Sequence, residues 1–143
     1  MTESAGRALG LDLGEERIGV AITDAARTVA TPLEVIPARD RAAADTRITE
    51  LIDEWEISVV VVGMPYGLDG NEGPAARRTH AVVKRLGATQ SVPFVTYDER
   101  LTTVEAHRIL DEQQVSGRDR RAMVDMVAAQ VILQGWIEKT RHG

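Results

Sequence analysis

Apolar and polar residues alternate at the start of the chain in the manner of β-strands. Within residues 8–13 small and large side chains take turns, and Asp12 lies on the small face. Turn residues follow, and a second apolar run over 17–22 predicts a β-hairpin with Asp12 near its tip. A third strand is expected over 29–36, where Pro32 favours a sheet edge or a bulge. Three strands with such short connections predict an antiparallel meander. The large face of the first strand consists of Leu9, Leu11 and Leu13, and the small face of Ala8, Gly10 and Asp12.

The apolar pattern then changes to the period of a helix and back to that of a strand. Asp40 is expected to cap a helix whose apolar residues recur at helical spacing. The β-branched run over 57–63 has no polar face, which is typical of a central parallel strand covered on both sides. It leads into a loop over 64–74 that is rich in glycine and proline. This loop either faces a substrate beyond the carboxyl end of the strand or is a plain connection. The core-facing positions of the helix are Ile48, Leu51, Ile52 and Trp55.

A helix, a strand and another helix follow. Pro74 at the first helical position and Gly87 just past the last one delimit a helix within 74–87. The strand over 92–97 ends in two acids, Asp98 and Glu99. A capping-box pattern then starts a helix over 102–110. The apolar face of the first of these helices consists of Ala75, Thr79, Val82, Val83 and Leu86.

The last predicted helix, about 119–139, is apolar nearly all round in its middle, which indicates burial. Asp125 lies within this apolar stretch. Ala128 and Ala129 share its face, and their small size lets the helix come close to a neighbour. The natural neighbour is the small face of the first strand.

Length and composition place the chain among ordinary globular proteins. It has 143 residues, of which 43% are hydrophobic and 27% are charged, and we expect one domain over 1–143 with 1–6 and 140–143 frayed. Because the chain has no cysteine, thiolate metal sites and a cysteine nucleophile are excluded. No apolar run is long enough to cross a bilayer and the start lacks the features of a signal peptide. A cytoplasmic protein without a membrane partner is therefore expected.

The charge distribution changes this picture only locally. A formal net charge of -5 argues against a protein that coats nucleic acid by bulk attraction. Three basic residues of the predicted helix over 74–87 are nevertheless candidate contacts to a nucleic-acid backbone: Arg77, Arg78 and Lys84. The alternative for such a cluster is an ordinary solvated helix face.

Three acids interrupt apolar elements: Asp12, one of Asp98 or Glu99, and Asp125. Asp12 taken alone is more simply a turn or cap residue. Three such interruptions, however, call for partners, because an unpaired buried charge costs several kcal/mol. The neighbouring segments offer only Arg100 as an obvious close cation. Oxygen ligands without cysteine favour Mg²⁺ or Mn²⁺, and two such ions about 4 Å apart can activate a water and stabilise the leaving oxygen of a phosphodiester. Asp98 and Glu99 alternate across the strand, so only one can join Asp12, and the spacing leaves open which.

Short motifs spread over nearly the whole chain match one known family. They are GLDLG (10–14) with RIGVA (17–21), VGMP (62–65) with 69–70 and 72–74, DERLTT (98–103), and 124–125 with 128–129. In these motifs the chain resembles the YqgF (RuvX) family of Holliday-junction-resolvase-like proteins, and it departs from the family most in 64–68. The resemblance implies an α/β, ribonuclease H-like fold, with a five-stranded mixed sheet of three antiparallel and two further parallel strands flanked by helices.

The resemblance also implies a metal-dependent nuclease. Asp12, Glu99 and Asp125 would be its catalytic residues and metal ligands, which favours Glu99 over Asp98, and Arg100 would steady a phosphate. Family members look like nucleases that process the 5′ end of the 16S ribosomal RNA precursor, and some have been proposed to resolve Holliday junctions. Structured RNA is therefore the expected substrate, with branched DNA as the alternative.

Two other classes stay in view. The acid-Leu-Gly hairpin also occurs in the sugar-kinase and actin-like fold, but that architecture needs two such domains and 143 residues supply one. A catalytically silent module would bind RNA without metal and without turnover. Resolving a four-way junction needs two active sites and so a homodimer, for which the sequence shows no partner face.

Overall fold

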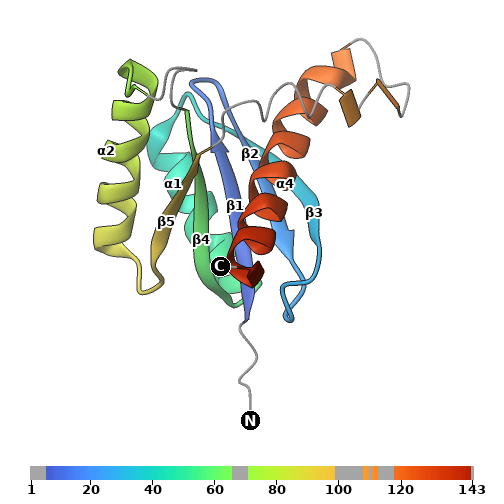
Figure 1. The fold of residues 1–143 in the computed structure, drawn as a ribbon. Helices are drawn as coiled ribbons and strands as arrows, with labels where there is room; N and C mark the ends of the chain where they lie inside the picture. Colours follow the sequence, from blue (N-terminus) through green and yellow to red (C-terminus); the bar gives the residue numbers. More distant parts are fainter. Residues whose placement is uncertain (1–5, 66–70, 99–107, 110, 113–117, 143) are drawn as a thin grey trace.

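Five strands form one mixed sheet in the order β3-β2-β1-β4-β5, and helices cover both of its faces (Figure 1). The computed structural model describes residues 6–65, 71–98, 108–109, 111–112 and 118–142. The strands are β1 (Arg7–Leu13), β2 (Arg17–Thr23), β3 (Ala30–Pro37), β4 (Ile57–Met64) and β5 (Phe94–Asp98). The helices are α1 (Arg41–Glu54), α2 (Pro74–Thr89) and α4 (Arg118–His142).

The strand directions confirm the predicted meander and the predicted parallel strands. β1 and β3 both run antiparallel to β2, whereas β4 is parallel to β1 and to β5. Because β1, β4 and β5 are parallel, their carboxyl ends lie at one edge of the sheet, the carboxyl-end edge, at the top of Figure 1. The three strands end there at Leu13, Met64 and Asp98.

The two faces of β1 separate as the alternation predicts. Leu9 and Leu11 belong to the core beneath α1 and α2, while Ala8 packs in the core beneath α4. β4 is buried along nearly its whole length, with Val60 facing the first core and Val61 the second. This confirms it as a central strand covered on both sides.

Helix α4 lies diagonally across the sheet and approaches it very closely (Figure 1). A Cβ at Gly10 would lie 3.2 Å from the carbonyl oxygen of Ala129, so the predicted contact of this helix with the small face of β1 is confirmed. Two glutamines of α4 also bind the backbone of the edge strand β3. The Ala30 N–H donates to Gln134 Oε1 at 3.0 Å, and Gln130 Nε2 donates to the Ala30 carbonyl at 3.1 Å. Hydrogen bonds and close packing together fix α4 over the sheet.

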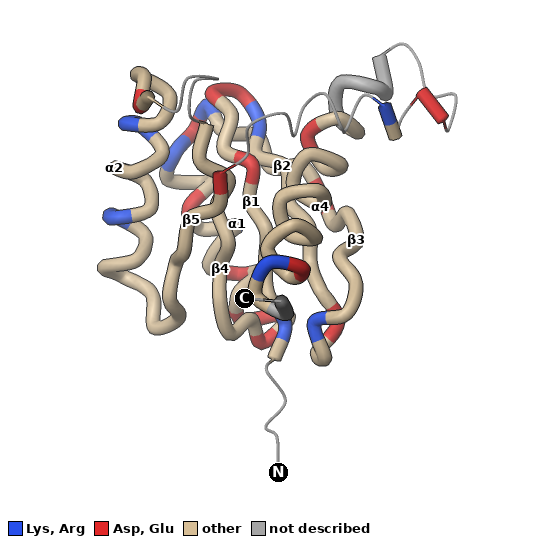
Figure 2. The backbone as a smooth tube through the Cα atoms, viewed as in Figure 1, with Lys and Arg blue, Asp and Glu red and all other residues tan. Residues whose placement is uncertain are grey.

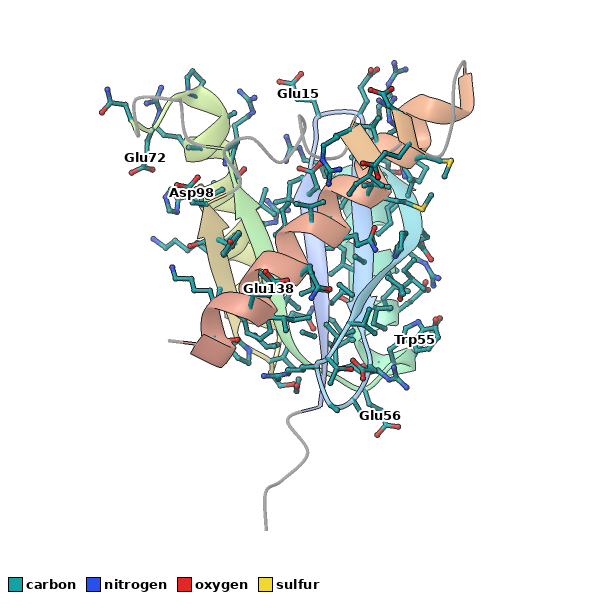
Figure 3. All side chains as sticks on the ribbon, turned by 45° about the vertical axis from the view of Figure 1, so that its right-hand side comes forward. Glu15, Trp55, Glu56, Glu72, Asp98 and Glu138 are labelled. Carbon is teal, nitrogen blue, oxygen red and sulfur yellow. The ribbon has the colours of Figure 1, made fainter. Side chains whose placement is uncertain are left out.

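Two expectations about element ends were wrong, those for Trp55 and Gly87. Trp55 is not a core residue: it follows the last turn of α1, is 37% exposed and packs its ring under the Arg7 guanidinium at 5.6 Å. Figure 3 shows it with Glu56 at the end of the molecule opposite the carboxyl-end edge. Residues 140–142, which were expected to fray, are part of α4 in this structure. The helix expected over 102–110 lies almost entirely outside the described residues, as do 66–70 of the predicted loop.

Gly87 does not end α2. The helix continues to Thr89, and its cap residue Gln90 has an extended backbone with φ -103°, so no left-handed residue is needed. Glycine at this end of a helix is required only where the chain leaves in the left-handed conformation.

Replacing Gly87 by alanine is therefore expected to stabilise the protein by about 0.5–1 kcal/mol, the usual difference between the two residues inside a helix. The new Cβ would have ordinary contact with Phe94 Cβ at 4.0 Å. Urea unfolding of G87A beside the wild type measures the difference. A loss of stability would contradict a continuous helix at this position.

Candidate active site

Asp12 lies at the carboxyl-end edge on the face of the sheet that α4 covers. It is the last but one residue of β1, it is half-buried, and its partner across the hairpin is Gly19 of β2. Residues paired across antiparallel strands share a face. Asp12 and Gly19 are thus neighbours beneath α4.

Asp125 meets the same glycine from the helix side. A Cβ built on Gly19 would lie 1.9 Å from the carbonyl oxygen of Asp125, a distance that no real side chain could occupy. The backbone of α4 therefore rests directly on β2 at this point. The structure brings Asp12 and Asp125, from opposite ends of the sequence, to either side of Gly19.

Arg17 supplies the positive charge next to Asp125. Its Nε donates to Asp125 Oδ2 at 2.6 Å, with side-chain exposures of 40% for Arg17 and 21% for Asp125. The hydrogen bond and the charge of Asp125 raise the pKa of the Arg17 guanidinium above its ordinary value. The expectation that only Arg100 could serve as a close cation was wrong, because β2 carries Arg17 to the same face as Gly19.

The candidates for the third acid are Asp98, the last residue of β5, and Glu99, which follows it in the sequence. Tyr97 faces α4, since its hydroxyl lies 2.6 Å from the Cβ position of Gly135. Asp98, the next residue, therefore faces the opposite side of the sheet, away from Asp12. Glu99 and Arg100 lie outside the described residues. Within the described part of the chain, no three acids or histidines form a group that could hold a metal ion.

The predicted basic residues all lie on α2, and two of them are already engaged. Arg78 pairs with Glu15 of the β1–β2 turn at 3.1 Å, and Arg77 Nη1 donates to the Glu72 carbonyl at 3.3 Å. Lys84 is exposed. Figure 2 shows acidic and basic segments side by side around the hairpin tip, and Figure 3 places Glu15, Glu72 and Asp98 toward the carboxyl-end edge. The first turns of α2 thus flank the edge where Asp12 lies.

A family model described as Holliday junction resolvase, RuvX, matches residues 6–139. The chain belongs to the RuvX family. The match covers Asp12, Gly19 and Asp125 together, so the residues that meet at β2 all fall inside the family's common region.

Relatives of this RuvX-family chain are similar over nearly their whole length. A protein of Anaeromyxobacter sp. (strain Fw109-5) is 46% identical over 132 residues, covering 92% of this chain and 96% of that relative. A protein of Roseiflexus sp. (strain RS-1) is 40% identical over 141 residues, covering 99% and 100%. Both are provisionally named pre-16S rRNA nuclease.

Two of the solved structures similar to this RuvX-family chain are resolvases bound to Holliday junctions. RuvC of T. thermophilus in complex with a Holliday junction substrate has a TM-score of 0.60 at 15% identity, over 96% of both chains. The fowlpox virus resolvase in complex with Holliday junction DNA has a TM-score of 0.55 at 10% identity, over 94% of this chain and 98% of that one. At such identities the likeness concerns the fold, which is ribonuclease H-like as expected.

Two residues of this site were not identified from the sequence, Gly19 and Arg17. For each of the two residues the sequence contained a feature that could have identified it. Gly19 is a residue without a side chain on a strand expected to be apolar, which indicates close approach of another backbone. Arg17 lies two residues earlier and hence on the same face.

The donor set fits a hard divalent cation. Asp12 and Asp125 offer carboxylate oxygens from one strand and one helix, both held by packed backbone at Gly19. Carboxylates are the ligands that Mg²⁺ and Mn²⁺ prefer, and rigid supporting elements keep such ligands in place.

Proposed function

We propose that this protein is a metal-dependent endonuclease that hydrolyses phosphodiester bonds in structured RNA, at the 5′ end of the 16S rRNA precursor. The observation that carries the proposal is the convergence of Asp12 and Asp125 at Gly19. Its substrate is suggested by the names of relatives that are 40–46% identical over nearly the whole chain. Such a function places the protein in the cytoplasm.

In this proposal Asp12, Glu99 and Asp125 hold the cations, Mg²⁺ or Mn²⁺. When bound, two such cations supply an activated water and stabilise the leaving oxygen of the phosphodiester. Glu99 is preferred to Asp98 because Asp98 faces the other side of the sheet from Asp12.

The other residues would hold the substrate. Arg100, next to Glu99 in the sequence, would steady a phosphate at the site. Arg77, Arg78 and Lys84 would contact the nucleic-acid backbone from α2, beside the carboxyl-end edge. For Arg78 this means exchanging the Glu15 carboxylate for a phosphate oxygen.

Cleavage of a four-way DNA junction is the second candidate. The description of the family model and the resolvases among the similar structures favour it. A resolvase must cut two strands, so this function would require two copies of the site in a homodimer. The two candidates share one site and differ in the nucleic acid that it accepts.

Chelation of the metal is expected to stop cleavage, and either Mg²⁺ or Mn²⁺ should restore it. The test incubates the purified protein with precursor rRNA or with a four-way DNA junction at one fixed salt concentration, since phosphate contacts weaken as salt rises. Faster cleavage of the RNA supports the first candidate, and faster cleavage of the junction supports the second. RNA binding that survives the chelator, with no cleavage of either substrate, would indicate a silent binding module.

A further inference from the structure

The ion pair between Arg17 and Asp125 involves a residue that the proposed function assigns to the metal. Arg17 Nε donates to Asp125 Oδ2 at 2.6 Å. Within the described residues, this is the one hydrogen bond made by the Asp125 carboxylate. The guanidinium therefore occupies one of the two Asp125 oxygens through which a cation could bind.

The position of Arg17 follows from the strand that carries it. Arg17 and Gly19 are two residues apart on β2 and share the face beneath α4. Gly19 lets the backbone of α4 rest on the strand at Asp125, so the neighbouring side chain on that face meets the Asp125 carboxylate. The close packing of α4 on β2 at Gly19 thus brings the Arg17 guanidinium to the Asp125 carboxylate.

Binding of a divalent cation would change the balance of charge around Asp12, Asp125 and Arg17. Without a metal, Asp12 and Asp125 bring two negative charges to one face, and Arg17 compensates the charge of Asp125. With a divalent cation on the same carboxylates, the guanidinium becomes a like charge at close range, which is unfavourable.

We propose that Arg17 is the counter-ion of Asp125 before the metal binds, and that Arg17 and the divalent cation compete for this carboxylate. The inference rests on the proposed function, because it takes Asp125 as a metal ligand. Arg17 is then a positioning residue: it holds Asp125 and α4 in place on β2 and lowers the affinity of the site for its cation.

The expected size of the effect is modest. Ion pairs that are partly exposed contribute little, and removing the competing charge should tighten Mn²⁺ binding about three- to tenfold. Arg17→Lys keeps the charge and should bind Mn²⁺ nearly as the wild type does. Arg39→Met is the matched control, because it removes the same charge from a nearby exposed arginine that pairs with Glu16 instead.

The experiment measures Mn²⁺ binding by calorimetry for the wild type, Arg17→Met, Arg17→Lys and Arg39→Met. Tighter binding by Arg17→Met alone supports the inference. Equal or weaker binding by Arg17→Met overturns it, and so does equal tightening by Arg39→Met, which would reflect net charge only.

A second measurement on the wild type decides the case even if Arg17→Met folds poorly. The Nε–Hε signal of Arg17, followed by NMR during addition of Mg²⁺, should lose its hydrogen-bonded shift as the metal site fills. A signal that keeps this shift at saturation overturns the inference.

Failure of the proposed function looks different. In that case the wild type and Arg17→Met both fail to bind Mn²⁺, or Asp12→Asn binds it as well as the wild type does. If instead the wild type binds Mn²⁺ through Asp12 and Arg17→Met binds it equally well, only the competition is disproved.

Discussion

Replacement of Asp12 by asparagine is expected to lower metal-dependent cleavage about 100-fold or more. The amide keeps the shape of the side chain but has no charge, and a cation shared between carboxylates contributes several kcal/mol to stabilising the transition state. The protein should stay folded, because the half-buried position keeps its volume and one negative charge beneath α4 is removed. Initial rates on precursor rRNA at saturating Mg²⁺ measure the loss.

Asp53→Asn is the control for this variant. Asp53 is an exposed acid near the end of α1, so the substitution changes the same charge away from the carboxyl-end edge. It should cleave as the wild type does. Full activity of Asp12→Asn would show that the convergence at Gly19 has no role in the chemistry.

Replacement of Gly19 by alanine should destabilise the protein by about 3 kcal/mol. The added Cβ would lie 1.9 Å from the carbonyl oxygen of Asp125, and this backbone atom cannot move aside without shifting α4. Displacement of the helix also carries Asp125 away from Asp12. Urea unfolding should show lower stability, and Mn²⁺ binding should weaken in the fraction that stays folded.

Gly73→Ala is the matched control for Gly19→Ala. Gly73 precedes α2, and a Cβ there would meet nothing within 4 Å. Its φ of -93° suits any residue, so stability should change little. A Gly19→Ala protein as stable as Gly73→Ala would mean that α4 does not rest on β2 as described.

The alternation of side chains was sufficient to predict the antiparallel meander of β1, β2 and β3 and the face of Asp12, whereas the complete five-stranded sheet came from the family resemblance. Small residues on β1 and on the last helix were also enough to predict that they pack together. These features depend on spacing along one element, or on one pair of complementary faces. They could therefore be inferred without coordinates.

What sequence reasoning missed depends on contacts between distant segments. Arg17 meets Asp125 only because Gly19 removes the side chain that would separate β2 from α4. No pattern within either segment shows that pairing. Trp55 was misplaced for a related reason, since helical spacing continues beyond the residue at which α1 ends.

The kinase-like alternative is tested by nucleotide binding. The resolvase structures match this chain over 94–96% of its length, which shows a shared fold, and a fold by itself does not select a function. Tight binding of ATP, measured by calorimetry, would favour the kinase-like alternative over the nuclease.

The order of elements along the chain has a consequence for biosynthesis. Asp12 leaves the ribosome among the first residues, whereas Asp125 belongs to α4, the final helix. Folding during translation proceeds from the amino terminus, so the hairpin forms while its partner helix is still inside the exit tunnel. A nascent chain consequently lacks half of the carboxylate pair, and the proposed metal site can form only after α4 has left the exit tunnel.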